Sequence, residues 1–111
     1  MKQKIMSKWI RQSGRWTDPP GEYRNVVEKE FTRELEMEIV QYPADSIRPA
    51  RMVLVFHGGP TGNESYYIDS LLLCRNDSED FCICAGTINS WPKCSVNAKE
   101  VFDFLGRNGY K

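Results

Sequence analysis

The sequence carries no net charge, because fifteen lysines and arginines balance fifteen aspartates and glutamates. A neutral chain makes no long-range field that would gather nucleic acid or an anionic membrane. No apolar run is long enough to cross a bilayer, and residues 1–14 lack the apolar core and cleavage site of a secretory signal. We therefore expect a cytoplasmic protein with neither a nucleic-acid nor a membrane partner.

Histidine is nearly absent, and the cysteines lack a metal-binding spacing. His57 is the single histidine, and Cys74, Cys82, Cys84 and Cys94 form no C-x2-C pair. Cys82 and Cys84 could share an ion from one face of a strand, but buried thiols acting as small apolar side chains explain them more simply. We expect free thiols, no metal and no cofactor, with Cys94 either filling a sheet–helix junction or reactive at a helix N-terminus.

Length and composition are those of one globular unit. The chain has 111 residues, of which 41% are hydrophobic and 27% charged. A chain of this size buries enough surface for one core, and its composition is far from that of disordered proteins. We therefore expect a single domain over residues 1–111.

The first residues predict a helix over 3–13. Ile5 with Trp9, and Met6 with Ile10, stand four apart and form an apolar stripe, and a glycine follows as a C-cap. The sequence DPPG then interrupts regular structure, because proline removes backbone donors and glycine tolerates positive φ.

Residues 26–41 are ambiguous between strand and helix. A mainly apolar set of residues alternates with a polar, mainly acidic set, as in a half-buried strand. The first set is Phe31, Arg33, Leu35, Met37 and Ile39, and the second is Glu30, Thr32, Glu34, Glu36 and Glu38. Four-residue spacings and a capping-box pattern also fit a helix. Met37 would lie across that helix from its apolar stripe, so a strand is favoured.

The remaining segments predict strands over 51–57, 65–75 and 81–89, joined by short loops without a crossover helix. A helix follows, with Ser95 as its N-cap, an apolar face that begins at Ala98, and Gly106 at its end. The expected fold is α+β. It is an antiparallel sheet of four or five strands, or a half-barrel, with an N-terminal and a C-terminal helix packed on one face.

The stretch VLVFHGGPTG resembles the oxyanion-hole strand of proline iminopeptidase-like α/β-hydrolases. The resemblance implies backbone amides facing a developing oxyanion, with His57 shaping the hole. That family also needs a Gly-x-Ser-x-Gly nucleophile and a far longer chain, both of which are missing here. The glycines are explained more simply as a turn between two strands.

The tripeptide from Gly14 to Trp16, after the expected short helix and before a long strand, is similar to the start of lipocalin-like barrels. The resemblance implies a ligand held inside eight strands, with a helix after the last one. Only four or five strands are expected here. A ligand-binding half-barrel therefore stands as an alternative.

These observations leave three hypotheses for function. The first is a small, non-catalytic binding or inhibitory regulator that recognises another protein through the acidic strand and nearby aromatic residues. The second is a small-molecule-binding half-barrel with a cavity lined by Trp16, Phe31, Leu35 and Tyr67. The third is a minimal hydrolase that uses the loop from His57 to Pro60.

We expect no catalytic residues, and the following candidates for ligand or partner binding: Trp16, Phe31, Leu35, His57, Tyr66, Tyr67 and Trp91. A small sheet with few covering helices leaves an edge or a face bare, and proteins commonly pair such surfaces. We therefore also expect a homodimer.

Overall fold

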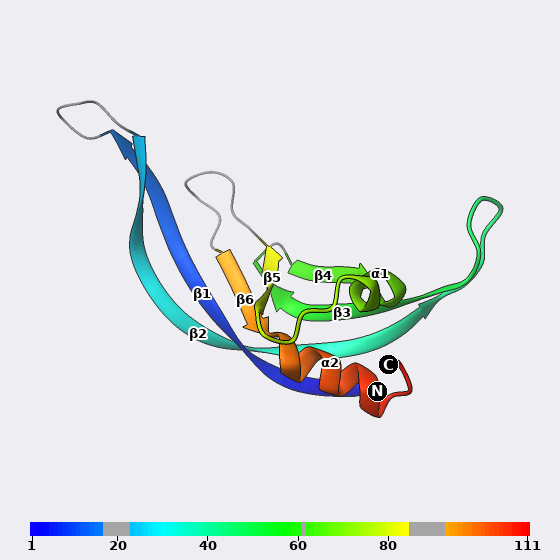
Figure 1. Ribbon diagram of the computed structural model, residues 1–111. Helices are drawn as coiled ribbons and strands as arrows, with labels where there is room; N and C mark the ends of the chain where they lie inside the picture. The colour runs from blue at the N-terminus through cyan, green and yellow to red at the C-terminus, as the bar shows by residue number, and fades with distance from the viewer. Residues whose placement is uncertain (17–22, 61, 85–92) are drawn as a thin grey trace.

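The computed structural model describes residues 1–16, 23–60, 62–84 and 93–111. The described chain is mostly sheet and contains two short helices (Figure 1). The strands are β1 (Lys2–Trp16), β2 (Tyr23–Tyr42), β3 (Arg51–Gly59), β4 (Gly62–Tyr67), β5 (Asp80–Cys84) and β6 (Lys93–Asn97), and the helices are α1 (Ile68–Leu73) and α2 (Ala98–Arg107).

All six strands belong to one antiparallel sheet with the order β4-β3-β2-β1-β6-β5. The long strands β1 and β2 curve strongly, and both helices lie on the concave side (Figure 1). The sheet is therefore a half-barrel, as one of the expected forms had it. The expected count of four or five strands was too low.

The prediction of a helix over residues 3–13 was wrong, because this segment forms β1. Ile5, Ser7 and Trp9 are buried, whereas Met6 is exposed. This is the two-residue period of a strand. Residues four apart share a face in a strand as well as in a helix, so the apolar stripe did not separate the two, and the polar Ser7 concealed the shorter period.

The strand prediction for residues 26–41 is confirmed, because this segment lies within β2. Leu35 and Met37 turn toward the concave face and are buried. Glu36 and Glu38 alternate with them and stand on the convex face. β2 pairs with β1 on one side and with β3 on the other. The glutamate row therefore lies in the middle of the sheet and not at an edge.

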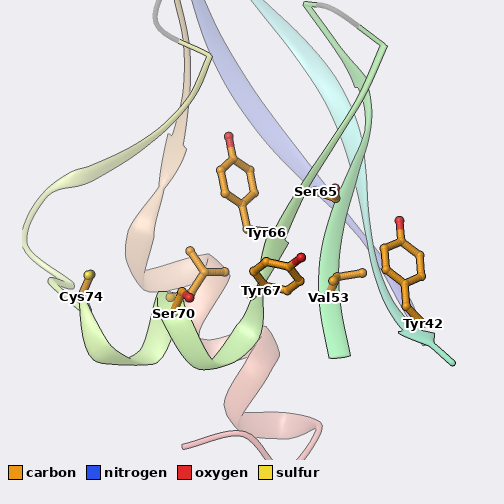
Figure 2. Close-up of a pocket in the computed structure, with 8 residues that line it drawn as sticks. Tyr42, Val53, Ser65, Tyr66, Tyr67, Ser70 and Cys74 are labelled. Atoms are coloured by element: carbon orange, nitrogen blue, oxygen red, sulfur yellow. The ribbon is translucent and has the colours of Figure 1, made fainter. Parts of the chain in front are cut away.

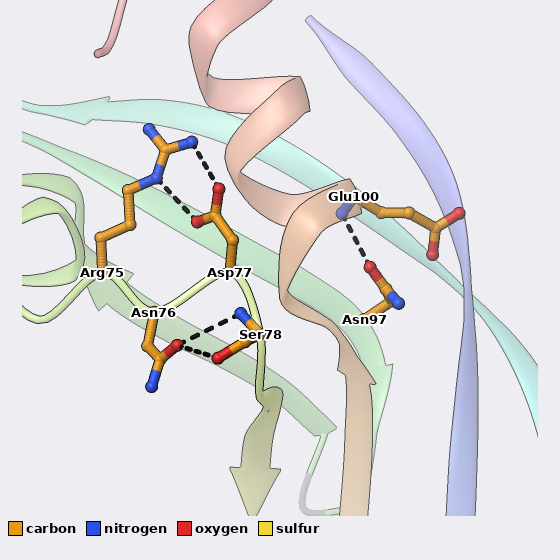
Figure 3. Close-up of polar contacts among 6 residues, drawn as sticks. All are labelled: Arg75, Asn76, Asp77, Ser78, Asn97 and Glu100. Atoms are coloured by element: carbon orange, nitrogen blue, oxygen red, sulfur yellow. Dashed lines mark hydrogen bonds and ion pairs between the residues drawn. The ribbon is translucent and has the colours of Figure 1, made fainter.

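The expected strand over residues 65–75 is only partly formed. β4 ends at Tyr67, and α1 begins at Ile68. Ile68 and Leu71, three positions apart, are both buried, so one turn of helix brings two apolar side chains onto the core. A polar turn follows, in which Arg75 pairs with Asp77 through two hydrogen bonds of 2.7 and 2.9 Å (Figure 3).

The C-terminal helix is confirmed, but it begins later than expected. Asn97 is its N-cap, because the Asn97 side chain accepts a hydrogen bond of 3.1 Å from the backbone N–H of Glu100 (Figure 3). Ser95, the predicted cap, lies inside β6 and pairs with Lys8 of β1. α2 also continues past Gly106 to Arg107. Strand pairing with β1 therefore displaced the cap by two residues.

The core fills the concave side of the half-barrel. It joins alternate residues of the strands to the apolar faces of both helices: Ile5, Trp9, Leu35, Met37, Leu54, Phe56, Ile68, Leu71, Ile83, Cys94, Val96, Ala98, Val101, Phe102, Phe104 and Leu105. Within the described ranges, neither helix has the length or the apolar content needed to cross a membrane. The convex face carries no helix (Figure 1).

Candidate functional site

The residues proposed from the sequence as a binding site lie on two different faces of the sheet. Phe31, Leu35 and Tyr66 belong to or pack against the concave core. His57 and Tyr67 stand on the convex face, in register with Glu36 and Val53. Trp91 lies outside the described residues, and Trp16 is described only as the end of β1, opposite Tyr23.

Two of the residues proposed to contact a ligand, Phe31 and Leu35, pack instead against other side chains of the core. Phe31 stacks on Trp9 with ring centroids 5.5 Å apart, and the Arg33 guanidinium lies 4.7 Å from the Trp9 ring centroid. Leu35 is almost fully buried among core side chains. Tyr67 is on the opposite face of the sheet. The structure therefore does not bring Phe31, Leu35 and Tyr67 together around one cavity.

His57, Gly58 and Gly59 form the end of β3, and Pro60 follows in the turn toward β4. Gly58 and Gly62 have φ values of +88° and +106°, which favour glycine, and Gly59 pairs with Gly62. The imidazole Nε2 of His57 lies 3.0 Å from Oε1 of Glu38. In the described part of the chain, no serine or cysteine side chain hydrogen-bonds to His57. The turn expected over Gly58 to Gly62 does connect two strands, but it is shorter than expected, because Gly58 and Gly59 belong to β3 and Gly62 to β4.

Two lysines of β1 lie near three glutamates of the row on the convex face. Lys2 lies 3.7 Å from both Glu36 and Glu38, and Lys4 lies 3.5 Å from Glu34. The hydrogen bond with His57, and then the charge of Lys2, hold the pKa of Glu38 below its ordinary value. The acidic strand is therefore already paired within the protein.

The three cysteines whose side chains the structure describes differ in exposure and position. Cys74 and Cys82 are exposed, which corrects the expectation of a buried Cys82. Cys94 is fully buried in β6, opposite Trp9 and three positions before the Asn97 cap, so it fills a sheet position and does not lie at the helix N-terminus. Among the residues that the structure describes, no cluster of three potential metal ligands occurs.

A groove of about 420 Å³ runs over Tyr67, from the convex face of β2 and β3 to α1 (Figure 2). Its walls are Tyr42, Val53, Ser65, Tyr66, Tyr67, Ser70, Leu71 and Cys74. β4 turns into α1 directly after Tyr67, so the groove forms where the sheet loses its edge strand. Aromatic and aliphatic surfaces with a few hydroxyl groups are typical of binding sites.

Arg51 stands beside this groove at the start of β3. Its guanidinium lies over two rings that line the groove, 5.3 Å from the centroid of Tyr42 and 5.9 Å from that of Tyr67. Arg51 pairs with Tyr42 in the β2–β3 register, and Tyr67 pairs with Val53. Register thus places all three side chains on one face. We call Tyr42, Arg51 and Tyr67 together with the groove walls the tyrosine–arginine groove.

Sequence reasoning selected Tyr67 but missed Tyr42 and Arg51. The two flank the loop from Pro43 to Ala50, and a hairpin between β2 and β3 must place them opposite each other. Assigning the hairpin register from the sequence would therefore have paired an arginine with a tyrosine on one face. The position of Tyr67 beside Arg51 could not be predicted from this hairpin register, because it depends on where β4 ends.

No protein-family model matches the chain, and neither a curated protein nor a solved structure matches it. The site is therefore interpreted from its own geometry.

Proposed function

We propose that this chain is a non-catalytic binding protein that recognises another protein through the tyrosine–arginine groove. The observation that carries the proposal is the Arg51 guanidinium held between Tyr42 and Tyr67 at the border of the groove. Tyrosine and arginine are the residues that most often dominate the binding energy of protein interfaces.

Exposed apolar side chains on the elements that line or adjoin the groove support this proposal. Tyr42 is 37% and Tyr67 45% exposed, and two aliphatic residues nearby in the chain, Ile47 of the β2–β3 loop and Leu73 of α1, are 88% and 87% exposed. Four of the six large apolar residues that the described chain exposes therefore come from the β2–β3 loop, α1 and the strand ends beside them. Such concentrations commonly mark interaction surfaces.

The acidic strand, which was expected to contact the partner, contributes less to this surface. Glu34, Glu36 and Glu38 pair with lysines of β1, and Glu38 also pairs with His57. A partner that used these carboxylates would have to displace the existing pairs. The tyrosine–arginine groove offers contacts that need no such exchange.

Site-specific photo-cross-linking tests the proposal. A photoreactive benzoylphenylalanine replaces Tyr67 in one variant and Met6, an exposed convex-face residue of β1, in the control. We expect a partner that is cross-linked from position 67 only, and a stoichiometric complex when that partner is purified. Tyr67→Ala should weaken the complex by about 30-fold, the effect of a hot-spot truncation, while Met6→Ala leaves it unchanged.

The proposal is wrong if both positions capture the same proteins, or if Tyr67→Ala leaves the affinity of the purified complex unchanged. Native mass spectrometry of the same preparation counts the copies of this chain. A dimer that persists in the Tyr67→Ala variant would place the expected homodimer contact elsewhere on the molecule.

The groove volume favours a second candidate function, the binding of a small molecule. About 420 Å³ lies within the range of small-molecule sites, and the walls combine aromatic surface with the hydroxyl groups of Ser65 and Ser70. Native mass spectrometry of the untreated protein distinguishes the two candidates. A retained mass that Tyr67→Ala abolishes would favour the small molecule over the protein partner.

A further inference from the structure

Arg51 has hydrogen-bond donors that the described chain does not satisfy. A guanidinium carries five N–H donors. The one hydrogen bond from Arg51 within the described ranges goes from Nη1 to the carbonyl oxygen of Pro49, at 3.4 Å, and Nε is buried without a partner. Because Nε is enclosed by the protein, a partner can reach only the terminal nitrogens of Arg51, and within the described ranges these make no hydrogen bond other than the long one to Pro49.

No described carboxylate forms an ion pair with Arg51, although Asp45 lies near enough to sense its charge. The oxygens of Asp45 are committed to the β2–β3 loop, where Oδ1 accepts from the backbone N–H groups of Ile47 and Arg48 at 2.8 and 2.6 Å. These two hydrogen bonds, first that of Ile47, hold the pKa of Asp45 below its ordinary value. Within the described ranges, Arg51 therefore stands beside the groove without a carboxylate at ion-pair distance.

The two tyrosine rings orient this charge. A guanidinium that lies over aromatic faces keeps its N–H groups free at its edge, in the planar arrangement that matches the two oxygens of a carboxylate. Next to it, the groove offers the exposed ring surfaces of Tyr42 and Tyr67, above the buried side chains of Val53 and Leu71. The site thus places the Arg51 guanidinium beside an apolar groove. Two neighbouring side chains of one peptide segment could contact both.

We propose that the partner segment bound in the tyrosine–arginine groove carries an aspartate or glutamate next to an aromatic or aliphatic residue. The carboxylate accepts hydrogen bonds from the terminal nitrogens of Arg51, and the apolar side chain packs in the groove against the exposed ring of Tyr67. This inference rests on the proposed function, and it names the chemistry of the protein partner.

Selection from a phage-displayed library of random octapeptides on the full-length protein tests it. Enriched sequences are synthesised, and their affinities are measured by fluorescence anisotropy for the wild type, Arg51→Gln, Arg51→Lys and a control, Lys4→Gln. Lys4→Gln also removes one positive charge from the convex face, but on β1. Two-dimensional amide spectra confirm that each variant is folded.

We expect enriched peptides that hold an acidic residue beside an apolar one. Replacing the acid by its amide, or Arg51 by glutamine, should each weaken binding by about tenfold or more, since a charge-assisted pair is lost. Arg51→Lys should give an intermediate loss because the planar fork is missing, and Lys4→Gln should change the affinity by less than about twofold. The peptide substitution on the wild-type protein decides the question even if Arg51→Gln does not fold.

The inference is overturned if no peptide is enriched, if the enriched peptides lack an acidic residue, or if the amide and acid peptides bind equally. The proposed function is judged separately by cross-linking from position 67. A purified complex that depends on Tyr67 but is insensitive to Arg51→Gln would keep the interface and refute the acidic segment.

Discussion

The hydroxyl group of Tyr66 on β4 donates a hydrogen bond to the backbone carbonyl of Ile83 on β5. These strands are the two opposite edges of the sheet. The Tyr66 ring also packs edge-on against Phe81 of β5, with centroids 5.1 Å apart. The two edges of the half-barrel are therefore joined by side chains and not by a strand ladder.

Tyr66→Phe tests this joint. The variant keeps the ring and removes the hydroxyl group, so we expect a loss of about 1 kcal/mol in the free energy of unfolding, the usual net value of a hydrogen bond. Urea denaturation measures it. Tyr67→Phe, on the convex face, is the matched control and should cost less than about 0.5 kcal/mol. Equal effects of the two variants would contradict the joint.

Ser7 holds the Trp9 indole in the concave core. Ser7 is 1% exposed, accepts a hydrogen bond of 2.6 Å from Nε1 of Trp9, and donates one of 2.6 Å to the carbonyl of Arg33. Ser7→Ala leaves a buried donor and a backbone acceptor unsatisfied. We expect a loss of about 1–3 kcal/mol in stability and a changed tryptophan emission, measured by fluorescence-detected urea denaturation.

The control for Ser7 is Ser70→Ala, which truncates an exposed serine and should change stability by less than about 0.5 kcal/mol. If Ser7→Ala changed the free energy of unfolding as little as Ser70→Ala, the hydrogen bonds that link Trp9, Ser7 and Arg33 would not contribute to stability.

Asn97 and Ser95 distinguish the true helix cap from the one expected from the sequence. Asn97→Ala removes the acceptor for the N–H of Glu100 and should cost about 1 kcal/mol. Ser95→Ala changes a residue within β6 and should cost less than about 0.5 kcal/mol. Thermal denaturation of both variants measures the difference. The reverse order of effects would place the start of α2 two residues earlier.

Glu38 should contribute to stability in a pH-dependent way. Its pKa is lowered in the folded protein, first by the His57 hydrogen bond. A lowered pKa adds stability above the unfolded value, and that stability is lost as the pH falls through the folded pKa. We expect the melting temperature of the wild type to fall more steeply than that of Glu38→Gln from about pH 5 downward. Parallel curves would contradict the prediction.

The sequence favoured a strand for β2 over a helix that also fitted part of its pattern, and it predicted α2 from a clear helical spacing. In a helix, Met37 would lie across from the apolar stripe, so the alternation around it favours a strand. The apolar spacing from Ala98 to Leu105 fits no strand. β1 failed because its apolar residues stand four apart, a spacing that both periods share, and only the burial of Ser7 on the core face shows which one applies. A polar residue on the buried side cannot be recognised before its partners, Trp9 and Arg33, are placed.

For the candidate site, too, some features follow from the sequence and others only from the tertiary structure. The sequence alone determined that the chain alternates in the strand period through Leu35 and Met37, because side-chain periodicity is a local property of the backbone. Only the tertiary structure decided that Tyr42, Arg51 and Tyr67 meet. Their contact depends on the register of three strands and on the point at which β4 gives way to α1, and that point is set by the burial of Ile68 and Leu71 against residues distant in the chain.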